Sequence, residues 1–137
     1  MYTRRIVPAT LAVMTLLAVA VRAAHEEVWV TTDRTVDCSS LKTIVGDVIK
    51  EDMNDEQKCI ALFNCFRRLV FHRMNTRDSR DPIKLFNILG YTLCGSQGTV
   101  NCALLREAGI ECRVVCVPGH TFYEAKYDGD WHTFDTM

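Results

Sequence analysis

Three residues in the C-terminal part of the chain, Cys94, His120 and Asp135, have the side chains that nucleophilic catalysis by a thiol requires. Cys94 stands where a helical pattern begins, and the free amides and dipole of a helix start stabilise a thiolate. A histidine can take the proton of the thiol, and a carboxylate can orient the histidine and stabilise its cationic form. The sequence therefore predicts Cys94 as nucleophile, His120 as general base and Asp135 as orienting group.

A predicted hairpin brings His120 to Asp135. Asp128-Gly129 is a strong signal for a two-residue turn of type I′. If these two residues form the turn, Phe122 lies opposite Asp135 on the neighbouring strand. His120 is then a diagonal neighbour of Asp135, about 7 Å away at the backbone, and an imidazole and a carboxylate can span this gap. A three-residue loop or a bulge would shift the register, and His120 and Asp135 would then not share a face of the sheet.

Two glycines, Gly95 and Gly98, fall within the first turn of the Cys94 helix. Glycine costs about 1 kcal/mol relative to alanine inside a helix, so two in one turn suggest that another chain segment or a substrate approaches the backbone closely. The alternative is a helix that begins later, near Ser96 or Gln97, with Cys94 as a packed loop residue.

Three further side chains are candidates for the site. Tyr91 or Gln97 could donate a hydrogen bond to an oxyanion, together with backbone amides at the helix start. Trp131 is predicted on the same side of the sheet as His120, either as a wall of the site or as core. His132 is predicted on the opposite face of its strand and lacks the carboxylate partner.

The chain contains seven cysteines, which is an odd number. If the protein is exported, six could pair as disulfides and leave one reactive thiol; alternatively, most are simply buried small apolar residues. No CxxC pair occurs, so the sequence gives no support for a zinc site of the usual spacing, and we expect no metal or cofactor.

The first 23 residues have the features of an export signal. Arg4 and Arg5 precede an apolar run from Ile6 to Val21, and small residues follow, with cleavage expected before Ala24. The run is shorter than the roughly 18 apolar residues that a spanning helix needs, although an uncleaved membrane anchor is the alternative. We therefore expect an exported protein (periplasmic, secreted or in the cell envelope) with one domain over residues 24–137.

The charge of the chain argues against nucleic acid as a partner. The formal net charge is −1, and removal of residues 1–23 takes away three arginines and no acid. The remaining domain is more acidic and has no basic stripe. A protein or peptide substrate is the expected partner, and contact with a membrane is expected only through an uncleaved N-terminal segment.

Helices are predicted to precede the site. Ser39 or Ser40 can cap the first helix, Asn54 with Gln57 forms a capping box for the second, and Asp81-Pro82 suits the start of the third. Gly90 and Gly109 are placed to end helices in the left-handed conformation. The expected helices cover about 41–49, 55–72, 82–89 and 94–108, and a short strand is possible at 28–30.

Strands are predicted to follow the helices. From Ile110 the apolar period changes to two, Pro118-Gly119 breaks the pattern, and two further strands flank Asp128-Gly129. The expected strands cover about 110–116, 120–127 and 130–135. Helices followed by strands indicate an α+β fold, with N-terminal helices packed on a small antiparallel sheet.

The segment from Cys94 to Asp135 resembles the core of the transglutaminase-like superfamily, whose members are related to papain-type cysteine proteases. The resemblance rests on a cysteine that opens a helix, a leucine-rich helix end, a Gly-Ile step, an arginine, a Gly-His pair, an aromatic residue, a glutamate, a turn, a tryptophan and an aspartate. These are Cys94, Ala103-Leu104-Leu105-Arg106, Gly109-Ile110, Arg113, Gly119-His120, Phe122, Glu124, Asp128-Gly129, Trp131 and Asp135. The resemblance implies a Cys94–His120–Asp135 triad and acyl or amide chemistry.

Two functions follow from this resemblance. The first is an exported thiol-dependent acyl-transfer enzyme that acts on peptide or side-chain amides, as a cysteine protease, amidase or transglutaminase. The second is a catalytically inactive transglutaminase-like binding module of the cell envelope. Domains of this family usually continue with more sheet after the aspartate, which here is Asp135. The resemblance therefore implies either a fragment truncated at the C-terminus or a minimal domain with an exposed sheet edge.

Overall fold

Polar side chains cap three of the helices, where the sequence predicts them. The structure, a computed structural model, describes residues 35–74 and 80–137. Ser40 caps α2 (Leu41–Val48) and Asn54 caps α3 (Asp55–Leu69), each through a reciprocal capping box. Asp81 accepts hydrogen bonds from two amides at the start of α4 (Pro82–Lys84). These predicted helix starts are confirmed.

The helix α3 ends at Leu69, so the predicted continuation to His72 is wrong. The next residues form β1 (Phe71–His72), which pairs in parallel with β2 (Tyr91–Thr92). The amide of Phe71 donates to the carbonyl of Gly90, and the ladder continues with the amide of Arg73, which donates to the carbonyl of Thr92. The apolar period of α3 runs on into this segment, but the pairing with β2 decides its conformation.

A short π-helix, η1 (Leu85–Leu89), continues α4 and leads into β2. It ends at Gly90, whose φ of 67° lies in the left-handed region. The amide of Gly90 donates to the carbonyl of Leu85 at 2.8 Å. Gly90 therefore ends this helical segment as predicted.

The helix α5 (Cys94–Glu107) ends in a Schellman motif at Gly109, which has a φ of 78°. The amide of Gly109 donates to the carbonyl of Arg106, and the amide of Ile110 donates to the carbonyl of Leu105. The side chain of Ile110 is buried. The predicted role of Gly109 is confirmed.

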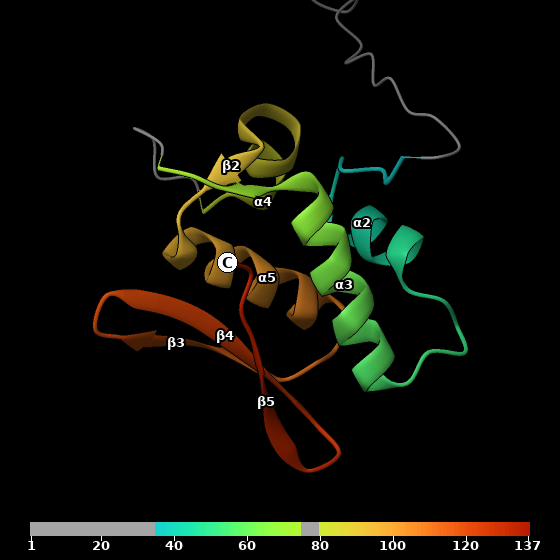
Figure 1. Cartoon of the computed structure of the whole chain (residues 1–137). Coiled ribbons are helices and arrows are strands. Elements are labelled where there is room, and N and C mark those ends of the chain that lie inside the picture. Colours follow the sequence, from blue (N-terminus) through green and yellow to red (C-terminus); the bar gives the residue numbers. More distant parts are fainter. Residues whose placement is uncertain (1–34, 75–79) are drawn as a thin grey trace, which may run out of the picture. The chain divides into compact units, whose positions relative to one another are not determined.

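The strands form one antiparallel sheet in the order β3 (Cys112–Val117), β4 (His120–Tyr127) and β5 (Asp130–Phe134). With the preceding helices, this sheet confirms the predicted α+β class. The strand β5 is shorter than β4 and pairs only with the second half of β4, from Tyr123 onward. The first half of β4 therefore pairs only with β3, and α5 lies against the sheet (Figure 1).

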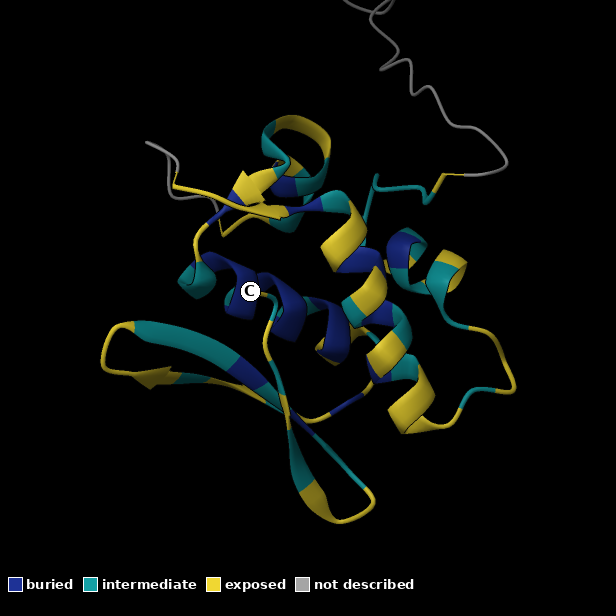
Figure 2. Ribbon diagram, viewed as in Figure 1, coloured by how far each residue is buried: buried dark blue, intermediate teal, exposed yellow. Residues whose placement is uncertain are grey.

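The helix α5 is buried on more sides than the sequence suggests. It contacts β3, β4, α2 and α3, and Figure 2 shows it as the most continuously buried helix. Its polar residues Ser96, Gln97 and Asn101 are as buried as the apolar residues around them. The largest buried apolar side chains of the core are Phe66, Ile44, Leu62, Leu85, Leu104, Leu105 and Val100.

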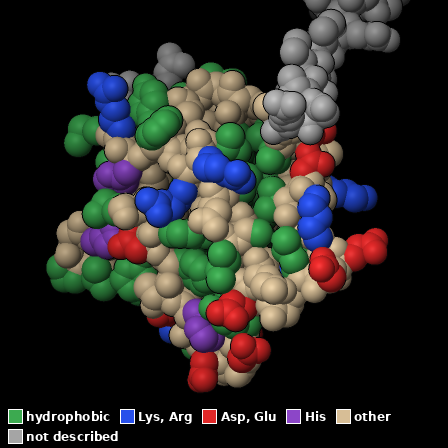
Figure 3. All heavy atoms as spheres, turned by 45° about the vertical axis from the view of Figure 1, so that its right-hand side comes forward, with side chains coloured by type: hydrophobic (Ala, Val, Ile, Leu, Met, Phe, Trp, Pro, Cys, Tyr) green, Lys and Arg blue, Asp and Glu red, His purple; other side chains and the backbone are tan. Residues whose placement is uncertain are grey.

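The surface carries charges of both signs. Acidic residues stand in the first turn of α3 and basic residues in its last turn, as the helix dipole favours. Figure 3 shows this mixture, with acidic side chains mostly in the lower half of the visible face. No helix in the described ranges is both long and apolar enough to cross a membrane. The predicted export signal and the strand at 28–30 lie outside the described residues.

Candidate active site

Cys94 is the first residue of α5, and no side chain caps the helix at this point. The N-cap residue is Leu93, which makes no side-chain hydrogen bond. Because the first amides of a helix have no acceptor within the helix, an uncapped start can accommodate an anion. The amides of Gly95 and Thr121 lie where they stabilise a negative charge on the Cys94 sulfur. The alternative of a later helix start, with Cys94 in a loop, is wrong.

The surroundings of Cys94 favour its thiolate. Burial raises the pKa of the thiol, but the hydrogen bond with His120, the amides of Thr121 and Gly95 and the charge of His120 outweigh it. The pKa of Cys94 is therefore below that of an ordinary cysteine. The residue is also partly accessible. A partly exposed thiol with a lowered pKa is the kind that reacts as a nucleophile.

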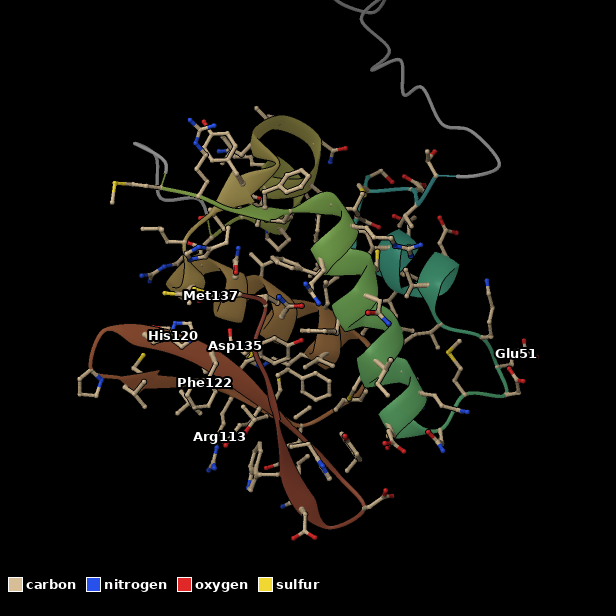
Figure 4. The ribbon with its side chains drawn as sticks, in the orientation of Figure 1. Glu51, Arg113, His120, Phe122, Asp135 and Met137 are labelled. Atoms are coloured by element: carbon tan, nitrogen blue, oxygen red, sulfur yellow. The ribbon has the colours of Figure 1, made fainter. Side chains whose placement is uncertain are left out.

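The ring of His120 links Cys94 to Asp135. Its Nε2 lies 2.8 Å from Oδ2 of Asp135, which leaves Nδ1 as the nitrogen available to the thiol. Hydrogen bonding to Asp135 and then to Cys94 raises the pKa of His120, against a smaller opposing effect of desolvation. Figure 4 shows His120 on β4 and Asp135 just beyond β5. The thiolate and the imidazolium therefore stabilise each other.

The geometry of the hairpin explains why His120 meets Asp135. Both residues of the Asp128-Gly129 turn have positive φ, as a type I′ turn requires. The ladder runs in the predicted register as far as Tyr123 opposite Phe134. Asp135 follows directly and reaches back to His120. The predicted register and the predicted approach of the two side chains are confirmed.

The segment after β5 is tied to the interior of the domain through Gln97. The hydroxyl of Thr136 donates to Oε1 of Gln97 at 2.6 Å, and Nε2 of Gln97 donates to the carbonyl of Thr92 at 3.2 Å. The amide of Met137 donates to Oδ1 of Asp135 at 3.1 Å. Gln97 is buried and its amide binds Thr92, so the prediction that Gln97 donates to an oxyanion is not supported.

The aspartate also lies within the electrostatic range of a second histidine. Desolvation raises the pKa of Asp135, but the amide of Met137, the hydrogen bond with His120 and the charges of His120 and His72 together lower it. The sequence placed His72 at a helix end rather than near the site. The pairing of β1 with β2 could have revealed its position, but a two-residue parallel bridge leaves no periodic signal.

Tyr91 lies on β2, three residues before Cys94. Its side chain is partly exposed, and its strand neighbour across the pair is Phe71. A role for its hydroxyl at an oxyanion stays a prediction.

Trp131 lies far from His120. It pairs with Lys126, six residues along β4, which corresponds to roughly 20 Å at the usual strand rise. The guanidinium of Arg113 stacks 4.1 Å from the Trp131 ring centroid and pairs with Glu124 at 2.6 Å. Figure 4 shows Arg113 directed away from α5. The prediction of Trp131 as a wall of the site is wrong, because strand alternation gives the face but not the position along the sheet.

His132 is separate from this group, as the sequence predicts. Its ring stacks on Tyr127 with centroids 3.7 Å apart, and its Nε2 lies 3.2 Å from the Tyr127 carbonyl. His132 thus contacts its own hairpin.

The two glycines of α5 differ in their surroundings. A Cβ at Gly98 would lie 3.4 Å from the carbonyl oxygen of Phe122 and 3.5 Å from Cγ1 of Val114, so α5 approaches the sheet closely there. A Cβ at Gly95 would meet nothing within 4 Å. Packing within the chain therefore accounts for Gly98 but not for Gly95.

All seven cysteines are free thiols in this structure. Two of them are close: the Cys112 thiol donates to the carbonyl of Cys102 at 3.3 Å, and the two thiols hydrogen-bond. This hydrogen bond with Cys102 lowers the pKa of Cys112. Cys116 is exposed on β3, where the hydroxyl of Thr121 donates to its sulfur.

A hollow of about 760 Å³ lies elsewhere, and its lining includes Asp47 on α2 and Arg67 and Arg68 on α3. It contains no residue of the Cys94 group. Among residues 35–74 and 80–137, no cluster of three or more histidine, cysteine or acidic side chains has the arrangement of a metal site.

The described part of the chain is thus an α+β protein in which a helix-start cysteine, a histidine and an aspartate are in contact. No family model matches the sequence, and comparisons with curated proteins and with solved structures return no match. The functional assignment therefore depends on the chemistry of these side chains.

Proposed function

We propose that this protein is a thiol-dependent acyl-transfer enzyme with a transglutaminase-like or papain-like core that acts on peptide or side-chain amides. The observation that carries the proposal is the contact of Cys94 with His120 and of His120 with Asp135. A lowered thiol pKa beside a raised histidine pKa favours transfer of the thiol proton to the imidazole, which is what activates a cysteine nucleophile.

The reaction begins with attack of the Cys94 thiolate on the amide carbonyl. The carbonyl oxygen becomes an oxyanion, and first-turn amides of α5 are placed where the helix dipole favours a negative charge. The imidazolium of His120 then gives its Nδ1 proton to the leaving amine as the C–N bond breaks. A thioester on Cys94 and a neutral His120 remain.

The second half of the reaction regenerates the enzyme. Neutral His120 removes a proton from an incoming water or amine, which attacks the thioester and expels the Cys94 thiolate. Asp135 holds the ring throughout and stabilises its charged form. Water is the default acceptor, because the described residues show no amine-binding feature near Cys94. The N-terminal sequence supports export as the setting of this activity.

Alkylation with iodoacetamide at pH 6.5 to 7.5 tests the activated thiol. The matched control is Cys116, an exposed cysteine on β3 of the same chain. We expect carboxamidomethylation of Cys94 to be faster than that of Cys116, because a lowered pKa leaves more of the Cys94 thiol ionised at this pH. Cys94 and Cys102 share one tryptic peptide, so fragment spectra must locate the label.

Amide hydrolysis and amine incorporation by the full chain test the reaction itself. A fluorogenic peptide-amide library reports hydrolysis, and casein as the acyl donor with a fluorescent primary amine as the acceptor reports transfer. We expect Cys94→Ala to abolish either activity and Cys116→Ala to preserve it. Equal alkylation of the two cysteines, or activity that survives Cys94→Ala, would sink the proposal.

A further inference from the structure

One edge of the antiparallel sheet has no neighbouring strand among residues 35–74 and 80–137. In the order β3, β4, β5, the strand β3 is paired on one side only. Its sequence, CRVVCV, is mostly apolar and contains neither glycine nor proline. A free strand edge of this kind is a template on which another strand can pair.

The backbone groups that face this free edge follow from the ladder between β3 and β4. The amide of Lys126 donates to the carbonyl of Glu111 at 2.8 Å, at the start of the ladder. In an antiparallel ladder, hydrogen-bonded pairs alternate with non-hydrogen-bonded pairs, so every second residue after Glu111 bonds to β4. The residues between these positions, Cys112, Val114 and Cys116, therefore direct their amides and carbonyls toward the free edge.

The side chains of β3 leave this edge open. Val114 is 37% exposed and Val117 is 45% exposed, and Cys116 is exposed as well. The one charged residue of the strand, Arg113, stacks on Trp131 of β5, so its side chain lies across the sheet and away from the edge. Natural proteins usually protect an edge with a lysine, a proline or a bulge, and β3 contains none of these.

A second copy of this chain has an edge that is complementary to this one. Two β3 strands related by a two-fold axis pair in the antiparallel direction. Their outward backbone groups meet when Val114 of one copy lies opposite Val114 of the other. Cys112 then lies opposite Cys116 of the other copy, and each outward amide of these residues faces a carbonyl.

The neighbouring registers that also bring outward groups together are less favourable. A two-fold axis at Arg113 places that residue opposite its own copy, and like charges in a cross-strand pair are destabilising. An axis at Val115 places Cys112 opposite Pro118, which has no amide to donate. The register centred on Val114 avoids both faults.

We infer that β3 is a self-association edge, through which two copies of this chain join their sheets by antiparallel pairing centred on Val114. The inference is independent of the proposed function, because the contact uses no side chain of the Cys94 group. Only one pair of short strands forms the contact, so the dimer is weak and forms reversibly as the protein concentration rises.

Sedimentation equilibrium and amide hydrogen exchange of the full chain, from about 10 µM to about 1 mM, test this association. We expect a dimer at the upper end of the range. The exchange of the Val114 amide should slow with concentration by the factor by which the monomer fraction falls. The Val115 amide bonds to β4 and should exchange slowly at every concentration.

Two lysine substitutions on β3 form a matched pair. Val114→Lys places two ammonium groups opposite each other at the two-fold axis and should keep the chain monomeric. Val117→Lys adds the same charge at another exposed valine, opposite Glu111 of the second copy, and should preserve the dimer. Cys116→Pro removes an outward amide at an exposed position and leaves the ladder to β4 intact, so it should also weaken the dimer. A slow Val115 amide reports that each variant is folded.

A chain that stays monomeric up to about 1 mM overturns the inference. A dimer that both Val114→Lys and Cys116→Pro leave intact does so too. A Val114 amide that already exchanges slowly in the monomer also overturns it, because the edge is then covered without a second copy.

Discussion

The hydroxyl of Thr136 donates a hydrogen bond of 2.6 Å to Oε1 of Gln97, a residue that is 1% exposed. The same Gln97 side chain donates to the carbonyl of Thr92, so one buried amide joins the segment after β5 to α5 and β2. Asp135 precedes Thr136 and is itself partly exposed. The orientation of the Asp135 side chain toward His120 therefore depends on the hydrogen bond between Thr136 and Gln97, which are 39 positions apart.

Thr136→Val removes this hydrogen bond and keeps the shape of the side chain. Because Oε1 of buried Gln97 loses its donor, we expect the free energy of unfolding to fall by about 1–2 kcal/mol. Release of Asp135 also lowers the stability of the imidazolium, so alkylation of Cys94 at pH 7 slows by about threefold to tenfold. Chemical denaturation and timed iodoacetamide labelling measure the two effects.

Thr136→Ser is the conservative control, since it keeps the hydroxyl and should restore the labelling rate. If Thr136→Val destabilises the domain but leaves the pH profile of Cys94 alkylation unchanged, the bond to Gln97 is structural and does not position Asp135.

The reactivity of Cys94 should depend on His120 in a pH-dependent way. In the wild type the alkylation rate rises through a pKa below that of an ordinary cysteine, because His120 and the local amides stabilise the thiolate. His120→Ala moves this pKa upward, so the rate at pH 6 to 7 falls by about tenfold per unit of pKa. The two rates converge above about pH 9, where both thiols are ionised.

His132→Ala is the matched control for His120→Ala, because His132 stacks on Tyr127 and takes no part in the Cys94 group. The pH profile of Cys94 alkylation in this variant should coincide with that of the wild type. A similar upward movement of the pKa in both variants would contradict a specific role of His120.

The pair of His120 and Asp135 should also give a pH-dependent contribution to stability. The raised pKa of His120 contributes stability below about pH 6.5. This stability is lost as the pH rises through the pKa that His120 has in the folded protein. The lowered pKa of Asp135 contributes above about pH 3.9 and is lost as the pH falls through its folded value. Asp135→Asn should therefore reduce the free energy of unfolding most between about pH 4 and 6.5. A pH-independent difference between the two proteins would rule out this pairing.

Gly95→Ala and Gly46→Ala form a matched pair of substitutions. Both glycines lie in helices, and a Cβ at either position meets nothing within 4 Å. Each alanine should therefore stabilise the domain by up to about 1 kcal/mol, with less at the first turn of α5. Only Gly95 adjoins the nucleophile, so only Gly95→Ala should slow a bulky alkylating reagent at Cys94.

Thermal unfolding and the N-benzyl-iodoacetamide rate distinguish the two glycine variants. If both leave the bulky-reagent rate unchanged, no substrate approach requires glycine at residue 95.

Oxidation should join Cys102 to Cys112. The Cys112 thiolate attacks oxidised glutathione and releases one glutathione. Cys102 then attacks the mixed disulfide and displaces the second glutathione. The two cysteine thiols thus give up two electrons, which reduce one glutathione disulfide to two thiols. The loop closed is about ten residues long, and the chain-entropy account gives about 2–3 kcal/mol of stabilisation. Non-reducing peptide mapping should find this disulfide with Cys94 free, and Cys102→Ser should remove the gain in stability. A disulfide that includes Cys94 would contradict this and favour the inactive binding module.

The features predicted correctly from the sequence have local causes. The Asp128-Gly129 turn specifies the register of its own hairpin, and Gly109 and the polar caps specify helix ends from a few neighbouring residues. The features that were missed depend on distant pairs. Nothing near Phe71 indicates its pairing with Tyr91, and nothing near Gln97 indicates its bond to Thr136. Trp131 shows the same limit, since its face was predicted but not its distance along the sheet.

The missing cap at Leu93 also determines when the thiol becomes reactive. A helix that lacks a cap has a less stable first turn, so this turn of α5 relies on partners from elsewhere in the chain. One such partner is the Thr121 amide, which reaches Cys94 only after β4 has docked. Cys94 is therefore an ordinary cysteine during folding and in any local opening that separates the hairpin from α5. Thiol reactivity thus reports on tertiary folding of this domain rather than on helix content.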